Sequence, residues 1–284
     1  MFHVRGLSYR YPKAEVPTIH ELNFDIHQGE IFGLLGPSGV GKSTTQKILT
    51  KLIRDYEGVV KFRGKSLKDY DKQYFQQIGV GFEMPVHFSK LTAEENLAFF
   101  KKLYRSTADT DALLKRVGLY DHRKKKVREY SKGMKIRLNF VRALLNNPLM
   151  LFLDEPTNGL DPANARVIKE MIKEFRERGG TVLLTTHLMN DVEELCDRVA
   201  FMADGRIVEI DSPKHLKLRD GERTVVVEYE DHEEIKQVSF DLDQLRQNEE
   251  FIHIVQHYKI LTMHTKETTL EDIFIQTTGV QAHE

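Results

Sequence analysis

The feature that most constrains the fold of this chain is a short apolar run that leads directly into a glycine-rich loop. Residues 31–35 read IFGLL, residues 36–44 read GPSGVGKST, and residues 42–53 have the composition of a helix. The loop fits the pattern G-x-x-x-x-G-K-[ST], in which glycines let backbone N–H groups converge on a phosphate. The flanking strand and helix argue against an ordinary glycine turn, so the sequence predicts a nucleotide-phosphate site.

Each residue type in this loop has an expected role. Lys42 would place a positive charge at the β- and γ-phosphates, and the Ser43 hydroxyl would be a ligand of Mg²⁺. The N-terminus of the following helix is itself attractive to anions. The predicted nucleotide-binding residues of the loop are Gly36, Pro37, Ser38, Gly39, Val40, Gly41, Lys42, Ser43 and Thr44.

Strand and helix patterns alternate along most of the chain, which predicts an α/β fold with a mostly parallel sheet covered on both faces. Expected strands include 20–26, 58–63, 78–82, 149–153 and 181–186; expected helices include 92–117, 132–146 and 162–178. Thr92 and Glu95 indicate a capping box at the start of the first of these helices. Near residues 219–222 the pattern changes. We therefore expect one large nucleotide-binding domain over 1–220 and a small α+β extension over 221–284.

Composition excludes several classes of protein. The chain carries 42 Lys+Arg against 43 Asp+Glu, a net charge of -1, so we expect no nucleic-acid partner. The basic run 122–128 (HRKKKVR) is interpreted as a solvated segment rather than a surface for nucleic acid or acidic lipid. Cys196 is the only cysteine, which rules out an internal disulfide and suits a reducing compartment. No run approaches the roughly 18–20 apolar residues of a membrane-spanning helix.

A second apolar run, LMLFLDEP at 149–156, ends in two carboxylates. An aspartate at such a strand end, here Asp154, can hold Mg²⁺, and the adjacent Glu155 could activate a water as general base. The alternative is a strand end capped by two solvated acids, which the phosphate loop makes less favoured.

Two further residues are candidates with open alternatives. His187 follows the buried run TVLLTT (181–186), at a strand end where α/β sheets place ligands, although a lone histidine is often structural. Tyr11 lies 25 residues before Gly36 and could stack on a base. An edge-strand tyrosine is an equally good interpretation of its spacing.

Taken together, these motifs resemble the ATP-binding subunit of a bacterial ABC transporter, of the kind that exports drugs or antibiotics. The resemblance covers about residues 2–218, with GPSGVGKST similar to the Walker A loop and LMLFLDEP to the Walker B strand. YSKGM (130–134) resembles the family signature and NGLD (158–161) the D-loop. The resemblance implies an N-terminal antiparallel β subdomain, a helical subdomain at about 84–146, and ATP with Mg²⁺ as cofactors.

The resemblance also implies how the signature is used. In this family two nucleotide-binding domains pair head to tail, so Ser131 and Gly133 would bind the γ-phosphate of the ATP held by a second copy. Asp161, in the segment similar to the D-loop, is a further expected nucleotide-binding residue. His187 would sense or stabilise the γ-phosphate, and Tyr11 would stack on adenine. The expected partners are a second copy of the chain and a separate transmembrane permease, reached from the cytoplasmic face of the membrane by the helices at 92–117.

Three departures from the family pattern stand out. The signature has Tyr130, Lys132 and Met134 where Leu, Gly and Gln are usual, and Asn158 is a D-loop variant. Glu83 stands where the family has the Q-loop glutamine. A carboxylate there is a possible Mg²⁺ ligand, and it adds negative charge beside the γ-phosphate.

The direction of transport is suggested only by resemblance. A glutamate at the position of Glu83 resembles some peptide-antibiotic export and immunity transporters. The segment ETTLEDIFIQTTG (267–279) resembles the closing segment of bacterial drug- and lipid-exporting ATPase subunits. We therefore expect an exporter subunit. The alternatives are an importer subunit and a non-transport relative in translation or DNA repair, and isolation of the membrane partner would separate them.

Overall fold

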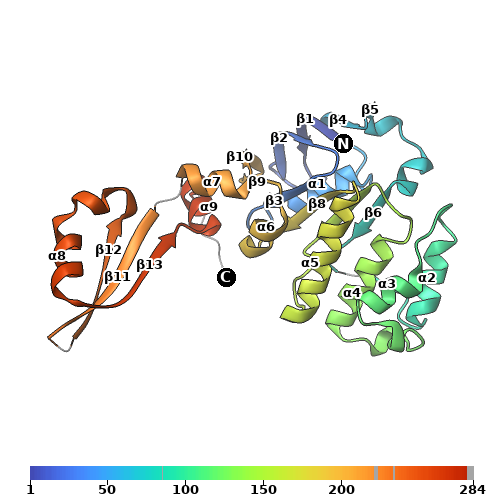
Figure 1. Cartoon of the computed structure of the whole chain (residues 1–284). Coiled ribbons are helices and arrows are strands. Elements are labelled where there is room, and N and C mark those ends of the chain that lie inside the picture. The colour runs from blue at the N-terminus through green and yellow to red at the C-terminus, as the bar shows by residue number, and fades with distance from the viewer. Residues whose placement is uncertain (85, 221–222, 233, 280–284) are drawn as a thin grey trace. The chain divides into compact units, whose positions relative to one another are not determined.

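The computed structural model describes residues 1–84, 86–220, 223–232 and 234–279, and it divides into two compact units (Figure 1). The first unit spans Met1–Ser212, and the second begins at Pro213. The sequence suggested a division near residue 220, eight residues later. The difference arises from helix α7 (Pro213–Asp220), which packs on α9 (Leu270–Thr278) of the second unit.

A six-stranded sheet forms the centre of the first unit. Its strand order is β10-β9-β3-β8-β7-β6, parallel throughout except for the pairing of β10 with β9. The bounds are β3 Ile31–Leu35, β6 Ile78–Gly81, β7 Met150–Asp154, β8 Thr181–Thr186, β9 Arg198–Ala203 and β10 Arg206–Asp211. Every residue of β3, β7 and β8 is buried, as their continuous apolar runs predict for central parallel strands.

An antiparallel sheet of order β2-β1-β4-β5 packs on the parallel sheet. Its strands are β1 Phe2–Tyr9, β2 Ile19–Ile26, β4 Glu57–Phe62 and β5 Lys65–Ser66. The two sheets share one apolar core, in which Phe24 of β2 stacks on Phe32 of β3 with ring centroids 5.7 Å apart. The alternating pattern of residues 20–26 thus places its apolar side on the core.

The helices of the first unit divide into those beside the central strands and those of a separate helical layer. α1 (Lys42–Leu49) follows the glycine loop, and α5 (Pro162–Glu177) and α6 (Met189–Leu195) contact β8. The remaining helices are α2 Ala93–Lys101, α3 Thr110–Arg116 and α4 Lys132–Ala143, with short 3₁₀ turns η1 Leu67–Asp69, η2 Lys72–Gln76, η3 Tyr120–His122 and η4 Val127–Glu129. α2 and α3 pack on α4, and α4 packs on β6 (Figure 1).

The segment 92–117, expected as one helical stretch, is two helices. Thr92 and Glu95 form the expected capping box: Thr92 Oγ1 accepts from Glu95 N at 3.1 Å, and Glu95 Oε2 accepts from Thr92 N at 2.7 Å. The first helix ends at Lys101, and Asp109 begins the second by accepting from the backbone N–H groups of residues 111 and 112. A second capping residue inside the stretch is therefore what divides it.

The second unit contains a three-stranded antiparallel sheet of order β12-β11-β13. The strands are β11 Arg223–Asp231, β12 Glu234–Asp241 and β13 Lys259–Glu267, with η5 Leu242–Gln247 and α8 Glu249–His257 in addition to α7 and α9. Val227, Phe240 and Ile254 form a small core between the sheet and α8. This is the α+β composition that the sequence predicts for the end of the chain.

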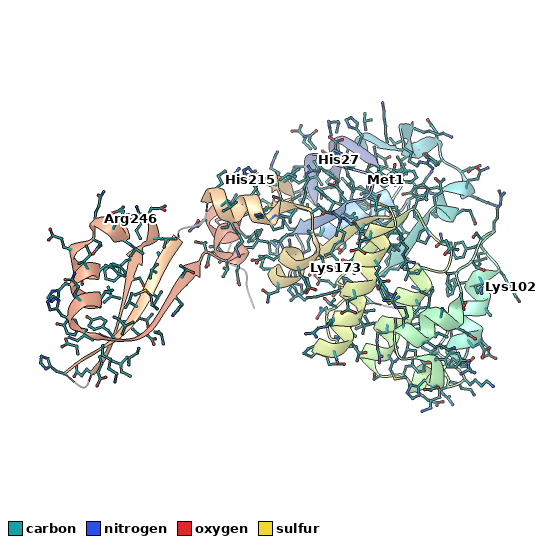
Figure 2. The ribbon with its side chains drawn as sticks, viewed as in Figure 1. Met1, His27, Lys102, Lys173, His215 and Arg246 are labelled. Atoms are coloured by element: carbon teal, nitrogen blue, oxygen red, sulfur yellow. The ribbon has the colours of Figure 1, made fainter. Side chains whose placement is uncertain are left out.

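The surface carries the long charged side chains. Lys102 after α2 and Arg246 in η5 both extend from the ribbon into solvent (Figure 2). No helix in the described part of the chain is long and apolar enough to cross a lipid bilayer.

Candidate functional site

The glycine loop between β3 and α1 adopts a conformation that only glycine accommodates at two of its positions. Gly39 has φ +84° and Gly41 has φ +111°, both in the region that side chains disfavour. A Cβ added at Gly41 would also lie 2.4 Å from Ile19 Cγ2. Substitution at this glycine would therefore displace β2 as well as strain the loop.

Lys42 is the first residue of α1, and its side chain reaches back over this loop. Its Nζ donates to the carbonyl oxygens of Gly36 at 2.6 Å and Pro37 at 3.0 Å, and the residue is 8% exposed. Burial lowers the pKa of Lys42, while the negative charges of Glu155, Asp154 and Glu83 act in the opposite direction. The lysine and the three acids thus belong to one electrostatic cluster, although they come from three segments of the chain.

Asp154 is the last residue of β7, and its carboxylate faces the loop. Oδ1 accepts from Thr185 Oγ1 of the neighbouring strand β8 at 2.5 Å and from Ser43 Oγ at 3.4 Å. Ser43 and Asp154 therefore direct two oxygen atoms at the same region. Hard oxygen donors of this kind are the ligands that Mg²⁺ takes, so these two residues fit the metal.

Glu155 follows in a left-handed backbone conformation, with φ +49°. Its backbone N–H donates to the carbonyl of Thr185 at 2.9 Å, which turns the side chain toward the end of β8. There Thr186 Oγ1 donates to Oε2 at 3.0 Å, and the backbone N and ring Nδ1 of His187 reach Oε1 at 3.0 and 2.8 Å. A non-glycine residue at positive φ is uncommon and is frequent at functional sites.

These contacts set the direction of the hydrogen bonds to Glu155. A carboxylate oxygen accepts, so the Nδ1 of His187 is the donor in this contact. A carboxylate offers about four acceptor positions, and three donors reach Glu155 in the described structure. One position is left for a water molecule.

Tyr11 lies beside the loop helix. Its hydroxyl is 3.3 Å from Thr44 Oγ1, its ring meets Tyr9 edge-on at 4.9 Å, and 37% of the residue is exposed. The structure therefore brings Tyr11 to the start of α1, with its ring accessible to a ligand.

Glu83 follows β6 at the edge of the same site. It is exposed, and together with Asp154 and Glu155 it lines a small cleft. Asn139 of α4 fixes this segment by donating from Nδ2 to the carbonyl of Phe82 at 2.8 Å. The helical layer thus determines where the Glu83 backbone lies.

The signature residues form a separate group. Ser131 caps α4 by accepting from Met134 N at 3.2 Å, and a Cβ added at Gly133 would lie 3.4 Å from Leu160 Cδ2. Asp161 caps α5 by accepting from Asn164 N at 3.0 Å, and hydrogen bonds from Asn164 lower the pKa of Asp161. Within the described residues, no hydrogen bond or ion pair links Ser131, Gly133 or Asp161 to the glycine loop.

One buried contact set was not anticipated from the sequence. Thr157, two residues after Glu155, donates to the carboxylate of Asp191 on α6, and Lys169 of α5 pairs with that carboxylate at 2.7 Å. Asp191 is 5% exposed. The hydroxyls of Thr185 and Thr186 were also missed, although two threonines directly before His187 at a strand end were an available signal.

This geometry defines a P-loop ATPase, with a phosphate loop at one strand end and paired acids at another. Comparisons with known proteins identify the kind. The family model described as "ABC transporter" matches residues 19–158, and one described as "Fluoroquinolone efflux ABC transporter C-terminal domain" matches residues 223–267. The chain belongs to the ATP-binding subunits of ABC transporters, and members of this class bind and hydrolyse ATP.

Individual relatives agree with this. A fluoroquinolones export ATP-binding protein of Mycobacterium tuberculosis is 48% identical over 99% of this chain and 94% of its own length. A bacitracin transport ATP-binding protein of Bacillus licheniformis is 33% identical over 92% of both chains.

The solved structure of an ATP-binding subunit of an ABC transporter matches with a TM-score of 0.71 and 28% identity, covering 78% of this chain and 93% of its own. A dimeric cassette bound to ADP and Pi in a post-hydrolysis state matches with a TM-score of 0.69 and 28% identity, covering 75% of this chain and 98% of its own.

Proposed function

We propose that the protein is the ATP-hydrolysing subunit of an exporter, and that it powers a separate membrane permease for a drug, a peptide antibiotic or a lipid. The named relatives that export fluoroquinolones and transport bacitracin support the export direction. The match of residues 223–267 to a fluoroquinolone efflux C-terminal domain supports it independently of the ATPase motifs. An importer subunit is the second candidate, and no observation on this chain favours it.

The observation that carries the hydrolytic role is the set of contacts around Glu155. Its carboxylate is held between Thr186 and His187, with one acceptor position remaining. Glu155 thereby suits a general base that takes a proton from the attacking water. His187, whose side chain is 49% exposed, orients this base through Nδ1, and a ring protonated on both nitrogens would donate from Nε2 to the γ-phosphate.

Lys42 and the loop amides hold the phosphates of ATP in this proposal. On binding, the ammonium group would exchange its two carbonyl contacts for phosphate oxygens. Ser43 and Asp154 hold Mg²⁺, and Glu83 is a third candidate oxygen ligand at the edge of the site. The metal would neutralise charge on the phosphates when it is bound.

Two copies of the chain are proposed to pair head to tail. Ser131 and Gly133 then bind the γ-phosphate of the partner's ATP, at the N-terminus of α4 where anions are favoured. Ser131 is exposed at this position, and the dimeric cassette with a TM-score of 0.69 supports pairing.

The permease is proposed to dock on the segment after Glu83 and on α2. Apolar side chains are exposed there, with Met84 and Val86 each 79% exposed and Phe88 and Phe99 45% and 46%. Large apolar surface of this kind marks an interaction site. Docking here would place the protein on the cytoplasmic face of the membrane as a peripheral subunit.

Replacement of Glu155 by glutamine tests the proposal. The amide keeps the shape but cannot accept a proton, so turnover should fall by about 10²–10⁴ while ATP binding remains. The variant should also accumulate ATP-bound dimers, visible by size-exclusion chromatography. Glu177→Gln, at the exposed end of α5, is the matched control and should behave as wild type. Wild-type turnover in Glu155→Gln would remove this residue from the mechanism.

A further inference from the structure

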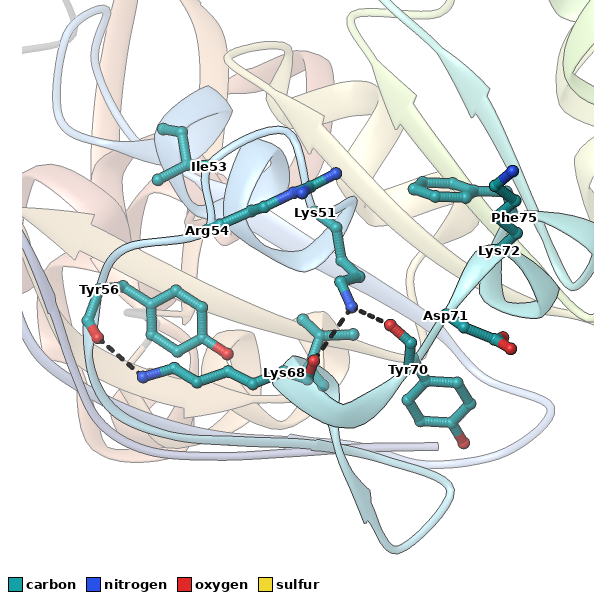
Figure 3. A pocket seen from close by; sticks show the side chains of 10 residues that line it. Lys51, Ile53, Arg54, Tyr56, Lys68, Tyr70, Asp71, Lys72 and Phe75 are labelled. Carbon is teal, nitrogen blue, oxygen red and sulfur yellow. Dashed lines mark hydrogen bonds between the residues drawn. The ribbon is translucent and has the colours of Figure 1, made fainter.

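A second pocket lies on the first unit, apart from the residues expected to hold ATP (Figure 3). Its volume is about 500 Å³, and its walls come from the segment after α1 and from η1 and η2. Pockets of roughly 300–1,000 Å³ are the usual size for small-molecule sites. Neither the glycine loop nor the acids after β7 line it.

The charge of this pocket is strongly one-sided. Lys51, Arg54, Lys68 and Lys72 line it, with Asp71 as the single acid among the lining residues. Lys51 donates to the carbonyls of residues 68 and 70, and Lys68 to that of residue 56 (Figure 3). Arg54 and Lys72 are exposed, and among the described residues neither has a carboxylate partner. Two cations are therefore available to an anionic ligand.

The charged groups around Lys51 affect its pKa. Burial lowers the pKa of Lys51, and the positive charges of Arg54 and Lys65 lower it further, while the carboxylates of Asp69 and Asp71 act in the opposite direction. An anion placed between these groups would relieve this repulsion, whereas a cationic ligand would add to it.

The rest of the wall is apolar and aromatic. Tyr56, Tyr70 and Phe75 contribute rings, and Lys68 Nζ lies 4.7 Å from the centre of the Tyr56 ring. Figure 3 shows the Tyr56 hydroxyl directed toward Lys68. A flat aromatic ligand would contact such walls without the conformational cost of a flexible one.

The Tyr56 hydroxyl supplies a further observation. It is buried, yet it has no hydrogen-bond partner among the described residues. A buried hydroxyl without a partner is costly and calls for an explanation. Burial also raises the pKa of Tyr56, so the group remains a donor at neutral pH.

We propose that this pocket binds a small aromatic anion, with its ring against Tyr56 and Phe75 and its negative group facing Arg54 and Lys72. The Tyr56 hydroxyl donates to an acceptor atom of the same ligand. The chemical class is an aromatic ring bearing a carboxylate or phosphoryl group. The inference is independent of the proposed transport function.

Isothermal titration of the full chain with 2-naphthoate tests this, in the presence of saturating ADP and Mg²⁺ so that Tyr11 and the glycine loop are occupied without turnover. We expect saturable one-site binding. Arg54→Gln/Lys72→Gln should weaken it by about tenfold or more, since each charged contact is removed. Lys124→Gln/Lys125→Gln, two exposed lysines of the basic run, is the charge-matched control and should bind as wild type.

Two other probes separate the parts of the ligand. 2-Naphthylmethanol has the ring without the charge, and inorganic phosphate has the charge without the ring. Both should bind at least about tenfold more weakly than 2-naphthoate, because each lacks one half of the recognition. Phosphate binding as tightly as 2-naphthoate would overturn the aromatic part of the proposal, and equal binding of the alcohol would overturn the anionic part.

Tyr56→Phe separates ligand binding from folding. Removing a buried hydroxyl that has no protein partner should leave the melting temperature of the free protein unchanged or raise it. The affinity for 2-naphthoate should fall by about fivefold or more, the effect of losing one hydrogen bond to a charged group. The absence of saturable binding to the wild-type chain at millimolar 2-naphthoate would overturn the proposal. So would wild-type affinity for 2-naphthoate in both Tyr56→Phe and Arg54→Gln/Lys72→Gln.

Discussion

The two regions that we propose to bind phosphate differ in how completely they are assembled. Around the glycine loop, Lys42, Asp154, Glu155 and His187 are joined by hydrogen bonds and charge within a single chain. Around the signature, Ser131 does no more than cap its own helix. The first region is therefore assembled within one chain, whereas the second is a helix N-terminus that we propose contacts the nucleotide of a second copy.

The difference has a physical reason. Charged side chains that are buried need partners, so the loop and the strand ends are fixed by one another. An exposed N-cap serine has already satisfied its helix, and its further use depends on what is brought to it. The comparison therefore predicts that the two regions fail in different ways when they are changed.

The largest effect is expected from mixing two inactive variants. Lys42→Ala removes the charge at the phosphates, and Ser131→Arg blocks the signature; each alone should lower turnover by about 100-fold or more. In a head-to-tail dimer, a mixture of the two places both defects in one site and leaves the other intact. Turnover should recover to about a quarter of wild type, because half of randomly formed dimers are mixed.

The control for this experiment is each variant mixed with itself at the same total concentration. Ser131→Arg also costs about 1 kcal/mol of helix capping, so circular dichroism should establish that the variant is folded. If the mixture stays as inactive as its components, the signature acts within its own chain and the comparison fails.

The next effect concerns Thr157, two residues after Glu155. Its hydroxyl binds the buried Asp191, which in turn pairs with Lys169, so it fixes the chain just after Glu155. Thr157→Val should lower kcat by about tenfold through misplacement of the base, with little change in ATP affinity. Thr157→Ser keeps the hydroxyl and should restore kcat, whereas equal losses in both variants would point to packing alone.

A smaller effect is expected at Glu83. If its carboxylate is a metal ligand, Glu83→Gln should raise the Mg²⁺ concentration needed for half-maximal turnover by a few-fold. One charge at about 4 Å is worth about 4 kcal/mol at an effective dielectric of about 20, but Glu83 is exposed and solvent screens most of this energy. If it acts only on the permease, the Mg²⁺ dependence should stay flat while stimulation by the reconstituted permease changes. A variant that alters neither measurement would leave Glu83 as a solvated loop residue.

The smallest effect tests how firmly the helical layer holds the segment after Glu83. Burial lowers the pKa of His87 from 6.5 to about 4, with Arg142 and Lys135 also opposing its charge, against one hydrogen bond to the Lys135 carbonyl. Because the unfolded chain then takes up the proton first, stability is full above about pH 6.5 and falls toward pH 4.

The measurement is urea unfolding at pH 7 and pH 5. After allowance for partial exposure, His87 should account for about 1 kcal/mol of the loss, and His87→Gln should remove that part of the pH dependence. His27→Gln, an exposed residue labelled in Figure 2, is the control and should leave it unchanged. An unaltered pH dependence in His87→Gln would mean that the histidine is solvated.

The sequence alone determined the elements with a strong local signal. The buried strands at 31–35 and 181–186, the helix after the glycine loop and the capping box at Thr92 all follow from local rules of periodicity and capping. The residue types of the site were also readable, since the phosphate loop and the paired acids each stand at the end of an apolar run. The position at which the helical segment 92–117 divides was not predicted, because Asp109 was not recognised as a cap.

Only the tertiary structure decided how these residues meet. The bonds from Thr186 and His187 to Glu155 depend on β7 and β8 being neighbours in the sheet, which no local pattern shows. The same holds for Thr157 with Asp191 and for the pocket beside Tyr56, whose walls come from separate segments. The sequence shows which residue types stand at the end of each strand. Which of these residues meet depends on the order of the strands in the sheet, and that order is a property of the whole packed chain.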